Sequence, residues 1–154
     1  MKGFILMAPP CPECGAHLHE GDSCQAIFDP FLALEFRDPA FGAVHFLSVA
    51  CFMIQHGRYS DQGLIWIAGQ LRAYLEEGRP IEYIRRRAAR EIRSQVRSWK
   101  VSRSPEAPRQ AEIPWSMTIA GVAGHYRDSG SYCELVTRWA RTTLKEMQPL
   151  LDRV

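Results

Sequence analysis

Apolar residues recur at the three- and four-residue spacing of amphipathic helices along most of the 154-residue chain. The clearest stripe lies in the segment 81–100, where the apolar positions are Ile81, Ile84, Ala88, Ile92, Val96 and Trp99. Similar patterns predict helices over 26–36 and 40–55, a third helix after Ser60, a short helix over 118–124 and a last helix from Ser131. No stretch shows the alternation typical of strands. We therefore expect an all-α fold, a single-domain helical bundle.

Turn-forming residues mark where the predicted helices begin and end. Asp38-Pro39 separates the first two, because the residue before a proline is disfavoured in helical conformation, and we expect these two helices to form an antiparallel hairpin. Ser60 is a suitable N-cap for the third helix. Ser131 and Glu134 match the capping-box pattern at the start of the last helix. The segment 102–114 contains three prolines and predicts a surface loop.

The composition is that of an ordinary globular protein, with 46% apolar and 23% charged residues. The apolar run in residues 1–8 is too short for a signal peptide. No stretch reaches the roughly 18 apolar residues of a membrane span. We expect a cytoplasmic protein with no membrane partner, in which an N-terminal loop over 1–25 folds as one domain with the bundle over 26–154.

The strongest chemical signal lies in that N-terminal loop, in a polar segment rich in turn-forming residues. Cys11 and Cys14 form a Cys-x-x-Cys pair, in which two thiolates grip one ion from a tight turn. Cysteines of a cytoplasmic protein are more often metal ligands than disulfides. With His19 and Cys24 the spacing becomes Cys-x2-Cys-x4-His-x4-Cys, so we predict a structural zinc site formed by Cys11, Cys14, His19 and Cys24.

The identity of the fourth ligand is left open by the sequence. His17 is two residues from His19 and could replace it. His56 is a further candidate, because an antiparallel hairpin that turns near Asp38 brings the end of the second helix within reach of Cys24. Cys51, on the same predicted helix, is the remaining alternative.

Two resemblances follow from these motifs. The ligand spacing is similar to that of a zinc knuckle, but Pro12 stands where knuckles carry the aromatic residue that stacks on nucleic-acid bases. The pairing of Cys-Pro-x-Cys-Gly-Ala with the helix that carries His45 and ends in Gln55-His56 resembles an uncharacterised bacterial protein family. This likeness covers about two thirds of the chain and implies a shared fold without an activity. Ala50 departs from the family pattern, where we expect an acidic residue.

Charge suggests one further partner. The formal net charge is only +2, but the predicted helix over 81–100 carries a basic stripe opposite its apolar face. This stripe could neutralise phosphates of DNA or RNA with little sequence selectivity. The glutamates nearby in sequence offer the alternative of a solvated, charge-balanced face. The stripe consists of Arg86, Arg90, Arg93, Arg97 and Lys100.

Histidines raise the possibility of catalysis. His45 and His56 lie on one face of a predicted helix, but a separation of roughly 16 Å is too large for both to bind one ion. A pocket that gathers His45, His56 or His125 would favour a hydrolase or transferase. A closed zinc site without a catalytic set favours a non-enzymatic regulatory or interaction protein that presents its helices to a protein partner. The sequence favours this second function.

Overall fold

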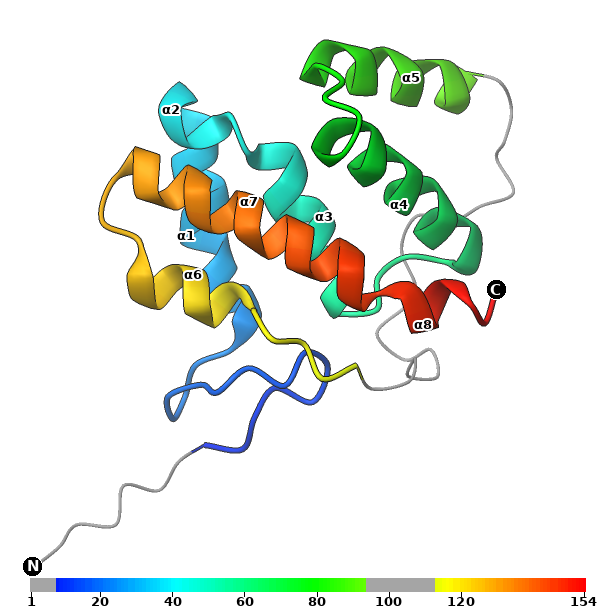
Figure 1. The fold of residues 1–154 in the computed structure, drawn as a ribbon. Coiled ribbons are helices and arrows are strands. Elements are labelled where there is room, and N and C mark those ends of the chain that lie inside the picture. The colour runs from blue at the N-terminus through cyan, green and yellow to red at the C-terminus, as the bar shows by residue number, and fades with distance from the viewer. Residues whose placement is uncertain (1–7, 94–112) are drawn as a thin grey trace, which may run out of the picture.

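The computed structural model describes residues 8–93 and 113–154, and in these ranges the regular elements are all helices (Figure 1). The predicted all-α fold is therefore confirmed for the described part of the chain. None of its helices has the length and apolar character needed to cross a bilayer. The helices are α1 (Cys24–Arg37), α2 (Pro39–Gly42), α3 (His45–Gln55), α4 (Asp61–Leu75), α5 (Ile81–Arg93), α6 (Ile119–His125), α7 (Ser129–Glu146) and α8 (Gln148–Leu151).

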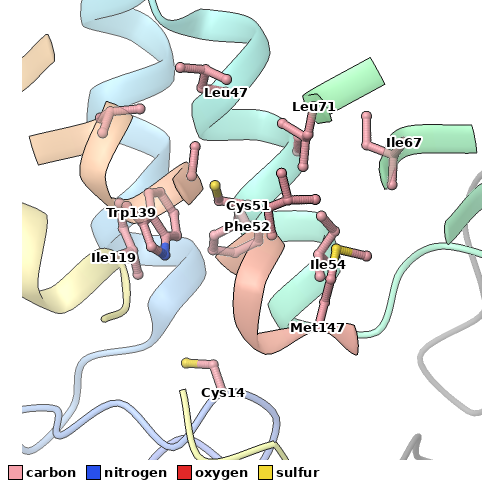
Figure 2. Close-up of a cluster of buried hydrophobic side chains, with 14 of the residues drawn as sticks. Cys14, Leu47, Cys51, Phe52, Ile54, Ile67, Leu71, Ile119, Trp139 and Met147 are labelled. Atoms are coloured by element: carbon pink, nitrogen blue, oxygen red, sulfur yellow. The ribbon is translucent and has the colours of Figure 1, made fainter. Parts of the chain in front are cut away.

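Helix α7 is the centre of the fold and packs against α2, α3, α4 and α6 (Figure 1). Its inner face repeats at helical spacing and is completely buried at Tyr132, Val136, Trp139 and Ala140. Figure 2 shows Trp139 and the residues of α3 and α4 that surround this face. Helix α5 lies at the outside, stacked on α4 and anchored by the buried Ile84.

Helices α1 and α3 form the predicted antiparallel pair, in a well-defined register. The rings of Phe28 and Phe52 stack with their centroids 4.3 Å apart. Two turns further along α1, Glu35 accepts a hydrogen bond from His45, at the start of α3. Moving seven residues forward along α1, from Phe28 to Glu35, thus corresponds to moving seven residues back along α3, from Phe52 to His45. This register places Cys24 opposite His56, one turn beyond the position expected from a hairpin that turns at Asp38.

The register differs because the chain turns differently than predicted. The expected helix over 40–55 is divided into α2 and α3 at Val44, whose backbone (φ −107°, ψ 14°) leaves the helical region. Asp38 caps α2 by accepting a hydrogen bond from the Ala40 amide. At Gly42 a Cβ atom would lie 2.5 Å from the Glu35 carbonyl oxygen, so this corner requires glycine. The short helix adds residues to the turn and shifts the pairing of α1 and α3.

The start of α7 also corrects a prediction. The N-cap is Asp128, which accepts a hydrogen bond from the Ser131 amide, while the Ser131 hydroxyl accepts one from the Asp128 amide. This is a capping box one turn earlier than the expected Ser131–Glu134 pair. Within α5, helix is described as far as Arg93; the predicted extension to Lys100, with Arg97, lies outside the described residues.

Candidate metal centre

Four side chains that ligate metals converge where the N-terminal loop meets the open end of the α1–α3 pair. Cys11, Cys14, Cys24 and His56 are all buried, and their ligand atoms lie within 4.8 Å of one another. We call this group the Cys3His cluster. The sulfur atoms of Cys14 and Cys24 are 3.5 Å apart. A tetrahedral zinc ion with Zn–S bonds of ~2.3 Å separates its ligand atoms by about 3.8 Å, so the cluster has the dimensions of a metal site.

The first two cysteines are presented by a tight turn. The Gly15 amide donates to the Cys11 carbonyl at 2.8 Å, and the Cys11 amide donates to the Ala16 carbonyl at 2.9 Å. Gly15 has a φ of +76°, which only glycine adopts without strain. The turn therefore points both sulfur atoms toward the end of the core, where Figure 2 shows Cys14.

Cys24 and His56 belong to two facing helix ends. Cys24 is the first residue of α1 and is buried. His56 is the C-cap of α3, and its Nδ1 lies 2.7 Å from the Phe52 carbonyl oxygen. Because a carbonyl only accepts, Nδ1 carries the proton and Nε2 holds a lone pair. That Nε2 atom is buried and has no hydrogen-bond partner among the described residues, so it is available as a ligand.

Neighbouring contacts fix the position of the ligands. The His56 ring stacks on Phe52 at a centroid distance of 4.1 Å. Arg58, just after His56, pairs with Glu13 at 3.2 Å, and Glu13 lies between the first two cysteines. These contacts hold the turn against the end of α3, as the supporting residues of metal sites commonly do.

A hydrogen bond joins the sulfur atoms of Cys14 and Cys24 and affects the pKa of both thiols. The hydrogen bond with Cys24 holds the pKa of Cys14 below the ordinary range of a thiol, whereas the same bond raises the pKa of Cys24. This hydrogen bond therefore favours a thiolate at Cys14. Further buried thiolates would repel one another, and a bound cation removes that penalty. The donor set of three sulfurs and one imidazole nitrogen is typical of zinc.

The structure brings together three of the four predicted ligands and places the fourth elsewhere. His19 is exposed and lies outside the cluster, as does His17, and the ligand position opposite the cysteines is taken by His56. Cys51 lies in the hydrophobic core, where burial raises the pKa of its thiol to about 12 (Figure 2). The sequence signal for His56 was the antiparallel pairing of the first two helices, which points to a residue near the end of α3.

A second polar group lies at the other end of the α1–α3 pair. The buried Glu35 carboxylate accepts hydrogen bonds from His45 Nδ1 at 2.8 Å, from the Ser48 hydroxyl at 2.9 Å and from the Tyr132 hydroxyl. Burial and the contact with Glu35 raise the pKa of Tyr132. The contact between Glu35 and Tyr132 joins residues 97 positions apart and could not be read from local spacing.

The histidines considered for catalysis are dispersed. His45 lies beside Glu35 with its side chain 57% exposed, and His56 belongs to the Cys3His cluster. His125 is exposed and hydrogen-bonds through Nδ1 to the Gly121 carbonyl at 2.8 Å. Ala50, where the family resemblance leads us to expect an acid, is buried in the core.

Comparison with known proteins agrees with this description at the level of the family. The model of a family of unknown function, DUF5946, matches residues 9–148 and so includes every residue of the Cys3His cluster. No curated protein and no solved structure matches the chain. The chain therefore belongs to the DUF5946 family.

Proposed function

We propose that this protein binds one structural zinc ion through Cys11, Cys14, Cys24 and His56, and that it acts as a non-enzymatic regulatory or interaction module. The observation that carries the proposal is the closed donor set: four buried protein ligands converge on one point. Four protein ligands complete a tetrahedral shell, whereas catalytic zinc sites keep a position for water or substrate. Bound zinc would stabilise the fold by joining the N-terminal turn to α1 and α3.

The distribution of the histidines supports a non-enzymatic role. Catalytic groups act together when their reacting atoms converge on one pocket. Here His45, His56 and His125 contact Glu35, Phe52 and Gly121 respectively, in three different parts of the fold. The helical surface is then the part of the molecule through which a partner would be recognised.

Metal content tests the proposal directly. We expect untagged protein purified without added metal to contain close to one zinc per chain by mass spectrometry, and to retain it through mild chelation. Substoichiometric or freely exchanging metal would indicate an open site and contradict the structural role.

A pair of cysteine variants adds a matched control. Cys14→Ser should lower zinc content and melting temperature together, because a serine hydroxyl is a poor zinc ligand. Cys133→Ser should change neither, since Cys133 is half-buried outside the cluster and its hydrogen bond to the Ala40 carbonyl can be made by serine. Unchanged melting of C14S after loss of the metal would contradict the structural role.

Nucleic-acid binding by α5 is a second candidate, favoured by one observation. Arg85, Arg86 and Arg90 are exposed on this outer helix, and none of them pairs with an acid among the described residues. By contrast, Arg87 pairs with Glu91 at 3.3 Å. The exposed guanidinium groups could therefore contact phosphates of a nucleic acid.

Fluorescence anisotropy with a short DNA duplex tests this candidate. Affinity should fall steeply as salt rises, and the double variant R86Q/R90Q should reduce the slope of log K against log salt by about two. The charge-matched double variant R37Q/R153Q should leave the slope unchanged. Absence of binding at low salt would rule out this function.

A further inference from the structure

A groove lies directly beside the cysteine turn, and no activity has been assigned to it. It is formed by four segments: residues 15–17 of the turn, the extended segment 115–118, α6 and α7. Its volume of about 490 Å³ is within the range of small-molecule sites, which is roughly 300–1,000 Å³. The side chains that matter for its chemistry are His17, Trp115, Met117, Thr118, His125 and Arg138.

The walls of the groove are held in place before any ligand binds. The Gln55 side-chain amide donates to the Met117 carbonyl at 2.9 Å and to the Thr143 hydroxyl at 3.1 Å, which ties the extended segment to α3 and α7. The Ser116 amide donates to the Glu146 carboxylate at 2.9 Å. On the opposite wall, Ala16 is buried and its carbonyl accepts from Cys11.

The polar groups of the groove favour an anion. The Arg138 guanidinium is exposed and makes neither an ion pair nor a hydrogen bond with the part of the chain that the structure describes. Thr118 is the N-cap of α6, yet its side chain makes no capping bond, so its hydroxyl is free to contact a ligand. Among residues 8–93 and 113–154, no carboxylate lines the groove. Glu146, which contacts its edge, accepts a hydrogen bond from the Ser116 amide, and Glu134, one turn before Arg138, is not a lining residue.

Apolar side chains form another part of the lining, beside the polar His17, Ser116 and His125. Trp115, Met117 and Leu135 supply it, and Trp115 is only partly buried, so one part of its ring system is accessible. Aromatic surfaces of this kind bind planar apolar groups, while one cationic side chain fixes the orientation of a charged end. The groove thus combines a site for a ring with a site for a negative charge.

We propose that this groove binds a small organic anion with an aromatic or apolar body, such as a carboxylate or a phosphate monoester. Arg138 would pair with the anionic group, Thr118 would hydrogen-bond to it, and Trp115 would contact the body. One wall is the cysteine turn, so the proposal rests on the zinc site to the extent that the metal fixes this turn. Such a ligand would bind beside the zinc site of the interaction module proposed above.

Nuclear magnetic resonance of the zinc-loaded protein tests the proposal with three probes. The indole N–H signal of Trp115, assigned with a Trp115→Phe variant, is followed during titration with phenyl phosphate, benzoate and neutral benzyl alcohol. We expect saturable shifts with one or both anions and none with the alcohol; the preferred anion distinguishes phosphate from carboxylate. Equal responses to all three probes would show simple apolar contact and overturn the proposal.

Two arginine variants complete the test. R138Q should weaken binding of the preferred anion about tenfold, the effect expected for a lost charge-assisted hydrogen bond at an exposed position. R153Q removes the same charge at the C-terminal end and should leave affinity unchanged. Equal affinity of R138Q and the parent protein would overturn the proposal. Zinc content is measured on the same samples. Anion binding by a folded protein that contains no zinc would contradict the proposed structural role of zinc and would leave the groove proposal intact.

Discussion

The replacement of His56 by alanine separates a metal-ligating histidine from one that is merely near the cysteines. His56 Nε2 is a buried lone pair among three thiols, whereas His19 is exposed in the preceding loop. We therefore expect H56A to lose zinc affinity and H19A to retain it. The sequence predicted His19 as the fourth ligand and kept His56 as an alternative, so the two variants compare these candidates directly.

The magnitude follows from the coupling of metal binding to folding. Loss of a residue that only supports a metal ligand lowers affinity by roughly 10–100-fold, so loss of the ligand itself should cost at least about 100-fold. At saturating zinc this corresponds to about 2.8 kcal/mol of lost stabilisation. For a domain of this size, the melting temperature should fall by about 6–11 °C.

A thermodynamic cycle isolates the metal contribution. H56A also removes the ring that stacks on Phe52 and the donor to the Phe52 carbonyl, which are losses that do not involve zinc. Thermal unfolding of parent and variant, each with zinc and after chelation, separates these terms, because the packing loss is present in both forms. The reasoning is refuted if H56A keeps one zinc per chain. It is also refuted if the zinc-dependent loss of stability, measured as the difference between the zinc-loaded and chelated forms, is as large in H19A as in H56A.

Three further predictions concern the fold around the site. Tyr132→Phe should destabilise the protein by about 1–3 kcal/mol in urea unfolding, because it removes one of the donors to the buried Glu35 carboxylate; a change below about 0.5 kcal/mol would contradict that role. Gly42→Ala should cost about 1–3 kcal/mol, since its Cβ would meet the Glu35 carbonyl, whereas Gly69→Ala, with nothing within 4 Å, should stabilise by about 0.4–1 kcal/mol. The Ser131 amide lowers the pKa of the Asp128 carboxyl. The cap therefore contributes stability above the usual aspartate pKa of about 3.9, and this contribution is lost as the pH falls through the lower pKa of the folded protein. The difference in melting temperature between the parent and D128N should thus disappear in acid, and a difference independent of pH would refute the cap.

The helical class and the cysteine segment of the candidate metal site could be predicted because they depend on local patterns. Apolar spacing indicates a helix wherever one face is buried, and Cys-x-x-Cys is a local device. The fourth ligand could not be fixed in this way, because it depends on how two helices pair. The observed pairing of α1 and α3 is shifted by one turn from the expected pairing. The shift arises because the short helix α2 and the tight contact at Gly42 lengthen the connection, and apolar periodicity does not indicate this.

Two other features were beyond sequence reasoning for different reasons. Ser131–Glu134 matches the usual capping-box sequence, whereas the box in the structure is formed by Asp128 and Ser131, which do not match that pattern. The contact between Glu35 and Tyr132 joins residues from α1 and α7, so it follows only from the packing of the bundle. Local motifs thus predict the kind of site, while the packing of the helices selects its members.

The pairing of α1 and α3 has a consequence for how the molecule opens. At one end the pair is held by the chain itself and by the bonds of Glu35 to His45 and Ser48. At the other end the Cys3His cluster connects Cys24 to His56. If the cluster holds the proposed zinc, removal of the metal would release only that second end, so that amide hydrogen exchange would accelerate in the first turn of α1 and the last turn of α3. The amides near Glu35 would keep their protection, and local opening of the apo protein would begin at the cysteines and proceed along the hairpin toward the buried carboxylate.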